Sequence, residues 1–262
     1  ILGIVYFTFQ ILWGINYNRR EISQSLGFDT QAPTQAELAV LCNRLATEAS
    51  QLRQGLEEDE YGVVSLPYGK HQALKMAYKG FDKASHYYPN LRGHYGDPKP
   101  IILSNLMSFT GITGFYFPFT GEANINMRIP EPLFAFTVAH EMAHQRGFAR
   151  EDEANFVSYI SCLHHPDEYF QYAGALSALI YSMNALGQIN RDMYQDIVNN
   201  YGGGVLRDLE YHKKFWQRHS GPIEKVSNRV NDAYLKAQNQ KGGVKSYGAM
   251  VDLLIGLQRK KP

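Results

Sequence analysis

Two histidines four residues apart on an apolar helical segment constrain this chain more than any other feature. Residues 135–148 read AFTVAHEMAHQRGF and contain His140, Glu141 and His144 in the pattern HExxH. On a helix, residues i and i+4 project from the same face, so both imidazoles can reach one metal ion. Burying these polar groups is costly unless a partner satisfies them, and a metal ion does so. The pattern predicts a hydrolase-type zinc site with one Zn2+ per chain, and Gly147 is expected to end the helix.

The third ligand is expected at the acidic start of the following helix. Catalytic zinc sites of this class take two histidines and one glutamate and leave a fourth position for water. Glu151 is the favoured ligand and Glu153 the alternative, while the remaining acidic residues would compensate the helix dipole. Asn155 follows Glu151 by four residues and is predicted to support one ligating imidazole from behind.

Glu141 is predicted to be the catalytic residue because it lies beside the first ligand. It would act as general base on a zinc-bound water, and the resulting hydroxide would attack a carbonyl carbon. The tetrahedral oxyanion then needs a donor in addition to zinc. Tyr211, His212 and Tyr247 are candidates for that donor, although a structural role is the simpler interpretation of each.

A short β region is expected just before the HExxH helix. Residues 101–127 contain a single charged residue and are rich in β-branched and aromatic residues. In zinc peptidases an edge strand above the metal pairs with the extended substrate. The segment Gly121, Glu122, Ala123 and Asn124 is the candidate for that edge, with an ordinary core hairpin as the alternative.

Most of the remaining sequence shows helical periodicity. Helices are expected over residues 34–57, 71–86, 131–146, 150–164, 167–187, 190–200, 204–218, 222–239 and 245–259. The expected fold is therefore α+β and predominantly helical, with a small sheet before the HExxH helix. Cys162 is expected to be a packed free thiol, and the sequence does not decide whether it forms a disulfide with Cys42.

The N-terminal segment is hydrophobic and is predicted to be the C-terminal part of a transmembrane helix over residues 1–20. Trp13, Tyr17 and Arg19 follow the apolar run in the order of a membrane interface. A buried N-terminal helix is the alternative. Residues 21–33 are expected to be a linker, and residues 34–262 a single catalytic domain. The net charge of +1 argues against a nucleic-acid partner.

Three sequence runs resemble a known bacterial family, the domain of unknown function 3810. These runs are WGINYNR (13–19), AHEMAHQRGFAREDEANF (139–156) and NDAYLKAQNQKGGVKSYGAMVDLL (231–254). The resemblance implies a zincin-like, specifically gluzincin-like, zinc peptidase domain anchored in the membrane and facing out of the cytoplasm. It also implies His140, His144 and one of the two glutamates as ligands, with Glu141 as base, but it names no substrate.

The combined prediction is a membrane-anchored zinc metallopeptidase acting on an unknown peptide or protein. The alternative is a zinc-binding sensor or receptor domain at the membrane, without turnover or with a single self-cleavage. A third class is a scaffold without activity, against which the intact Glu141 argues. Amide hydrolysis on cell-wall material remains open as a different chemistry for the same metal.

Overall fold

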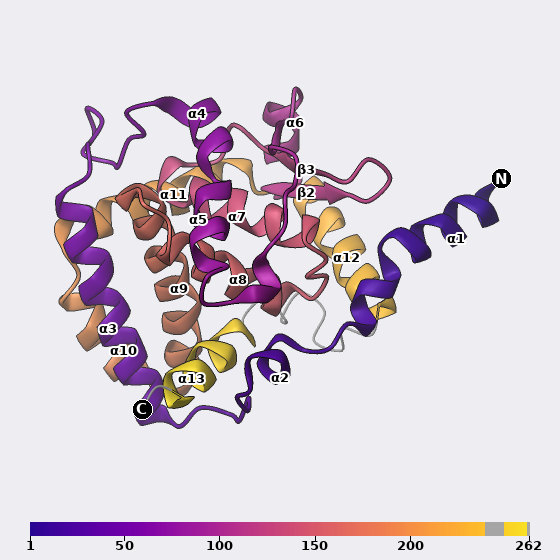
Figure 1. The fold of residues 1–262 in the computed structure, drawn as a ribbon. Helices are drawn as coiled ribbons and strands as arrows, with labels where there is room; N and C mark the ends of the chain where they lie inside the picture. Colours follow the sequence, from indigo (N-terminus) through magenta and orange to yellow (C-terminus); the bar gives the residue numbers. More distant parts are fainter. Residues whose placement is uncertain (239–248, 261–262) are drawn as a thin grey trace.

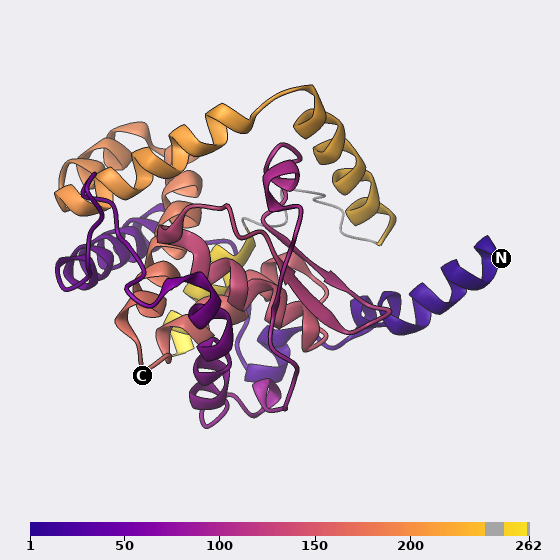
Figure 2. The same ribbon diagram turned by 90° about the horizontal axis from the view of Figure 1, so that it is seen from above.

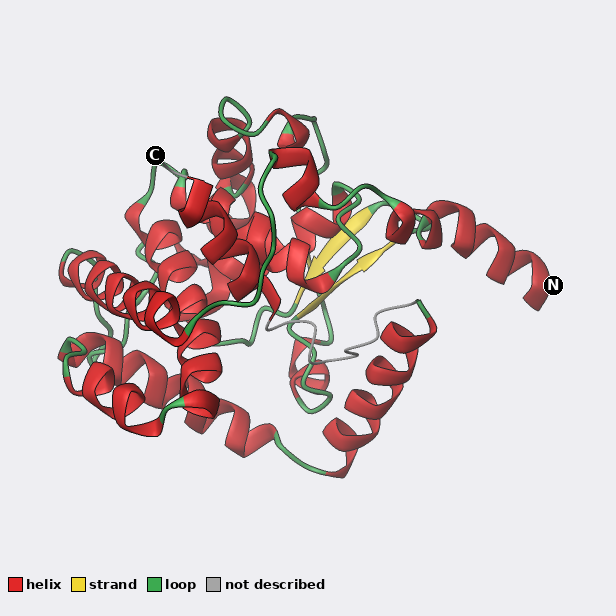
Figure 3. Cartoon of the chain, turned by 90° about the horizontal axis from the view of Figure 1, so that it is seen from below, coloured by secondary structure: helices red, strands yellow, loops and turns green. Residues whose placement is uncertain are grey.

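The computed structural model describes residues 1–238 and 249–260 and is predominantly helical, with one small sheet (Figures 1 and 3). This confirms the predicted α+β class. The helices are α1 (Leu2–Leu12), α2 (Ile22–Leu26), α3 (Gln35–Gln54), α4 (Gly69–Met76), α5 (Tyr78–Ala84), α6 (Ser104–Ser108), α7 (Phe134–Gln145), α8 (Glu151–Leu163), α9 (Glu168–Ile189), α10 (Arg191–Asn199), α11 (Gly203–His219), α12 (Pro222–Ala237) and α13 (Met250–Lys260). The strands are β1 (Lys99–Pro100), β2 (Gly114–Phe117) and β3 (Glu122–Ile125).

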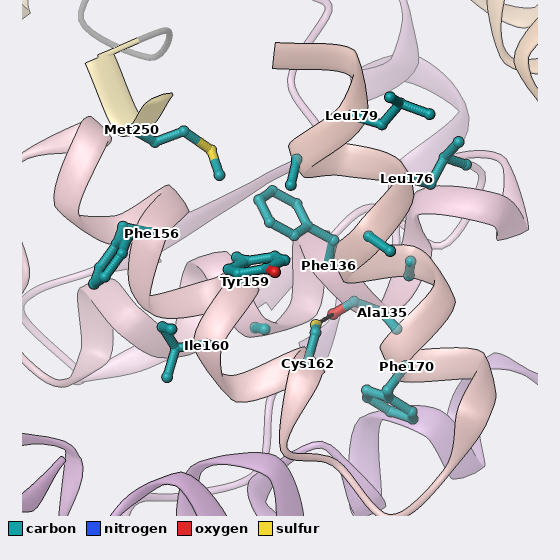
Figure 4. Close-up of a cluster of buried hydrophobic side chains, with 14 of the residues drawn as sticks. Ala135, Phe136, Phe156, Tyr159, Ile160, Cys162, Phe170, Leu176, Leu179 and Met250 are labelled. Atoms are coloured by element: carbon teal, nitrogen blue, oxygen red, sulfur yellow. Dashed lines mark hydrogen bonds between the residues drawn. The ribbon is translucent and has the colours of Figure 1, made fainter. Parts of the chain in front are cut away.

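The core forms where α7, α8 and α9 pack against one another, with α3 lying along α9. Figure 4 shows side chains from α7, α8, α9 and α13 meeting in this core, among them Phe136, Phe156 and Met250. The start of α3 is fixed by a capping box, in which the hydroxyl of Thr34 accepts from the backbone of Glu37 and the Glu37 carboxylate accepts from the backbone of Thr34. The HExxH helix α7 contacts α8, α9, β2 and β3, so it is held on several sides.

Both cysteines are buried free thiols, as expected for Cys162, so no disulfide joins Cys42 to Cys162. The predicted helix over residues 71–86 is divided into α4 and α5. The region predicted as strands and turns over residues 101–127 also contains the short helix α6.

The sheet corrects the predicted substrate edge. Its strand order is β1-β3-β2, with β1 and β3 parallel and β2 and β3 antiparallel. Glu122, Ala123 and Asn124 lie in β3, the central strand, and Gly121 lies in the turn before it. β2 pairs with β3 along Glu122–Ile125, and β1 pairs with Asn124 and Ile125 on the other side, so the outer edge of the sheet on the β2 side belongs to Gly114–Phe117.

The N-terminal segment also differs from its prediction. Helix α1 projects away from the body of the molecule (Figures 1 and 2) and ends at Leu12, where a 3-10 turn follows over Gly14–Asn18, so the predicted helix does not continue to residue 20. Over residues 1–238 and 249–260, we find no helix whose length and hydropathy would let it cross a membrane. Trp13 and Tyr17 do not form an interfacial belt: both are buried, and Arg19 donates to the carbonyl of Arg146 at 2.9 Å.

The predicted linker over residues 21–33 is in part a docked segment. It contains α2, and Ile22 and Phe28 are buried. The backbone N–H of Ile22 donates to Oε1 of Glu153 at 2.8 Å, which ties the segment to the start of α8. The polar composition of residues 21–33 suggested a linker, but the buried side chains of Ile22 and Phe28 and this hydrogen bond hold the segment against the domain.

Candidate metal centre

A tight turn between α7 and α8 builds the centre of the site. Gly147 has a φ of +82°, a left-handed conformation that glycine adopts without the steric cost of a Cβ atom. The chain then folds back so that the Phe148 N–H donates to the carbonyl of Ala143 at 3.2 Å. Three residues later α8 begins at Glu151, whose carboxylate faces the two histidines of α7.

Three potential ligand atoms converge at this point. The Nε2 atoms of His140 and His144 lie 3.0 Å apart. Oε2 of Glu151 lies 3.2 Å from Nε2 of His140 and 3.4 Å from Nε2 of His144. The group is largely buried, and its ligand atoms are close enough together to hold one metal ion. The sequence prediction of Glu151 as the third member of the group agrees with this geometry.

The proton positions show why the group suits a cation. Nδ1 of His144 lies 2.7 Å from the carbonyl oxygen of Phe148, which can only accept, so Nδ1 carries the proton. In the neutral imidazole Nε2 then presents a lone pair to the other two ligand atoms. Burial by itself lowers the pKa of His144, but the Glu151 carboxylate outweighs it and raises that pKa to about 9. In the metal-free chain, His144 therefore carries a second proton on Nε2, next to the carboxylate of Glu151.

The carboxylate of Glu151 responds in the opposite direction. Burial raises its pKa, but the two imidazoles outweigh burial and hold the pKa well below the usual range of a glutamate. Glu151 is therefore an anion at neutral pH, as a metal ligand must be.

Glu141 lies on the same helix and faces an open space. Among the residues that the structure describes, its Oε2 has no hydrogen-bonding partner, and only 4% of the residue is exposed. Burial raises its pKa, an effect that His140 and His144 oppose. A Cβ atom on Gly114 would come within 2.7 Å of Cγ of Glu141, so a glycine at the start of β2 lets the carboxylate lie against the edge strand.

Glu153, the alternative ligand, is engaged elsewhere. Its Oε1 accepts from the backbone of Ile22 at 2.8 Å and from Nη1 of Arg150 at 3.3 Å. These contacts direct the carboxylate toward the N-terminal segment and explain why two glutamates on one helical turn have different surroundings.

A cleft of about 790 Å³ opens onto these residues. His140, His144 and Glu151, the candidate metal-binding group, lie at its floor together with Glu141. β2 forms one wall, and residues of α1, of the turn after it and of α12 form the others. Helix α12 lies on the same side of the molecule as α1 (Figures 1 and 2). An extended chain in this cleft would run beside the free edge of β2.

Three aromatic residues in the wall of this cleft were missed as site residues. Nε1 of Trp13 donates to the hydroxyl of Tyr234 at 2.8 Å, and the hydroxyl of Tyr17 donates to the same oxygen at 3.5 Å. The ring of Trp13 also packs edge-on against that of His144, with centroids 5.5 Å apart. Burial raises the pKa of Tyr234, so its hydroxyl stays protonated. Trp13 and Tyr17 lie in the run WGINYNR (13–19), and Tyr234 lies at the start of the run over residues 231–254. Both runs carried the family resemblance, which could have indicated these three residues as part of the site.

The other predicted site residues have varied positions. Tyr211 is 40% exposed and does not line the cleft, and Tyr247 lies outside the described residues. His212 lines a second cavity beside His140 and accepts from Nε1 of Trp216 at 2.9 Å. Asn155 is buried at the wall of that same cavity and interacts with the hydroxyl of Tyr181.

Comparisons with known proteins give a family without an assigned activity. The family described as protein of unknown function (DUF3810) matches residues 1–255. No curated protein and no solved structure shows a significant match to this chain. Because the match spans nearly all of its 262 residues, the chain belongs to the DUF3810 family of proteins of unknown function.

Proposed function

We propose that this chain is a zinc metallopeptidase with a zincin-like catalytic domain. The observation that carries the proposal is the convergence of His140, His144 and Glu151 beside a buried carboxylate, Glu141, at the floor of an open cleft. Two imidazoles and one carboxylate are the ligand set of catalytic zinc in peptidases that leave one coordination position open.

In the proposed reaction, zinc and Glu141 have different roles. Zinc, when bound, supplies a Lewis acid that lowers the pKa of a coordinated water to about 7 and polarises a carbonyl oxygen. Glu141 accepts the proton from the attacking water and passes it to the leaving nitrogen. Its position suits both steps, because its buried carboxylate lies on the same helix as two of the metal-ligand candidates and faces the cleft.

The walls of the cleft suit a peptide. The free edge of β2 offers backbone N–H and C=O groups with which an extended substrate can pair as an additional strand. The hydroxyl of Tyr234 already accepts from Trp13 and Tyr17, so its own proton is available to donate to a developing oxyanion. We therefore propose Tyr234 as the oxyanion donor, the role for which the sequence offered Tyr211, His212 and Tyr247 as candidates.

The test compares zinc-loaded wild type with Glu141→Gln on a library of unstructured peptides, with products identified by mass spectrometry. We expect cleavage by wild type and a loss of about 10²–10⁴-fold in Glu141→Gln, which keeps its zinc. Tyr234→Phe should lose about 10²-fold in kcat with its zinc retained. Glu210→Gln, an exposed substitution on α11, is the control.

The zinc content decides how a negative result is understood. If wild type carries a full equivalent of zinc and cleaves no peptide, the peptidase proposal is wrong, and a sensor or receptor domain without turnover becomes the better account.

A further inference from the structure

A second cavity adjoins the metal centre behind His140. It has a volume of about 350 Å³ and lies between α7, α9 and α11. Its apolar wall consists of Ile129, Leu133, Phe136, Ile180 and Trp216. An apolar cavity of about 150 Å³ already binds benzene, so this one has room for an aromatic or a long aliphatic group.

The cavity shares part of its wall with the substrate cleft. His140, Gly111 and Thr113 line both spaces, so the two meet at a ligand of the metal-binding group. Gly111 has a φ of +75° and turns the chain at this shared rim, just before β2. A substrate paired with β2 and with its scissile carbonyl at the metal centre would have a neighbouring side chain at the mouth of the cavity.

The lining of this cavity is polar in places but uncharged. Among the described residues that line it there is no aspartate, glutamate, lysine or arginine. Its polar groups are hydroxyls, the amide of Asn155 and imidazoles. Nε2 of His212 accepts from Trp216, so this imidazole carries its proton on Nδ1 and is neutral, and burial lowers its pKa to about 4. A charged group entering the cavity would lose its hydration without gaining a counter-charge.

We propose that this cavity is a specificity pocket that receives a large, uncharged, apolar side chain of the substrate, aromatic or long aliphatic, next to the scissile bond. The inference rests on the proposed peptidase function, because the metal centre sets where the scissile bond lies. It adds a substrate class that the metal-binding residues by themselves do not define.

The test uses three hydroxamate probes on the zinc-loaded protein, with affinity measured by calorimetry, so that no turnover is needed. Acetohydroxamic acid reports metal binding alone, 3-phenylpropanohydroxamic acid adds a phenyl group, and succinohydroxamic acid adds a carboxylate. In wild type the phenyl probe should bind about 10- to 100-fold more tightly than acetohydroxamic acid, as expected for burying one aromatic group. Succinohydroxamic acid should show no such gain.

Two substitutions on α9 connect the gain to the cavity. Ser177 lines the cavity and is buried, so Ser177→Phe should fill the space and remove the gain of the phenyl probe while leaving the affinity for acetohydroxamic acid unchanged. Ile180→Trp narrows the cavity from a half-buried position and tests the same point if Ser177→Phe does not fold. Asn184→Leu, on an exposed position of α9, is the matched control.

The outcomes separate the two proposals. If all three probes bind equally, or if both filling variants leave the gain of the phenyl probe intact, the pocket is wrong and the metal site stands. If the zinc-loaded protein binds none of the probes, the open coordination position that the peptidase function requires is absent, and the pocket loses its basis with it.

Discussion

Two buried clusters of ionisable side chains in this chain differ in how their hydrogen bonds are completed. In the first, which we call the Asp208 cluster, the carboxylate of Asp208 accepts from Nε of Arg53 at 2.6 Å, from the hydroxyl of Tyr172 at 2.6 Å and from the backbone of Val64 at 2.9 Å. Asp208 is fully buried, and both its oxygens have donors. The chain itself supplies everything that this cluster needs.

In the second cluster, His140, His144 and Glu151, three potential metal-ligand atoms face one another. Two imidazole nitrogens and one carboxylate oxygen lie within 3.4 Å of each other, and the proton of His144 at Nδ1 is directed away toward Phe148. In the first cluster every acceptor has a donor from the chain itself, whereas the ligand atoms of the second lie close enough together that one metal ion could hold them.

Breaking the Asp208 cluster should have the largest effect on stability. Asp208→Ala leaves the buried Arg53 guanidinium without its buried partner and with only the partly exposed Glu58 as a counter-charge, so we expect a loss of about 3–5 kcal/mol in the free energy of unfolding, measured with urea. Zinc binding by the folded protein should be unchanged. Glu58→Gln, which removes a 40% exposed partner of the same arginine, is the control and should cost less than about 1 kcal/mol.

Removing the metal should give the next largest effect. Zinc at about 100 times its dissociation constant raises the free energy of unfolding by about 2.7 kcal/mol, and a chelator should abolish this gain. Glu151→Gln should show no zinc-dependent gain. A wild-type protein whose unfolding does not respond to zinc would place the second cluster in the same structural class as the first.

The half-buried imidazole of His212, which belongs to neither cluster, tests whether removal from water without a charged neighbour is enough to shift a pKa. Burial lowers the pKa of His212 from 6.5 to about 4. Between these values the unfolded chain binds more protons, so His212 makes the protein less stable as the pH falls below 6.5, by up to about 1.4 kcal/mol per pH unit. His212→Phe should remove this part of the pH dependence in urea unfolding. A difference between wild type and variant that does not change with pH would contradict the shift.

The smallest effect is expected at Glu153, the glutamate that resembles a ligand in sequence. Glu153→Gln weakens the contact with the backbone of Ile22 and should cost about 0.5–1.5 kcal/mol. The docked segment around α2 should then become more accessible to limited proteolysis. Unchanged proteolysis and stability would show that this hydrogen bond does not hold the segment.

The sequence predicted the elements whose evidence is local. The spacing of His140 and His144 and the glycine that ends α7 are both encoded within a few residues. Glu151 also follows from short-range spacing, because the turn at Gly147 fixes how α8 returns to α7. These features needed no knowledge of the tertiary structure.

The features that depend on distant contacts were predicted less well. Trp13 and Tyr17 resemble an interfacial belt because aromatic and basic residues follow an apolar run, but Trp13 contacts Tyr234, which lies 221 residues away. The edge position of β2 depends on the pairing of β3 with β1, which a strand pattern alone does not contain. The same is true of Tyr234, whose relation to the metal centre comes from the position of α12.

Zinc analysis of the purified protein tests the central claim most directly. Wild type and Glu153→Gln should each bind one equivalent of zinc, whereas His144→Ala and Glu151→Gln should lose it. That result would confirm that His144 and Glu151 contribute to the site and that Glu153 does not. A wild-type protein that binds no zinc, or a Glu151→Gln variant that retains a full equivalent while Glu153→Gln loses it, would contradict the account.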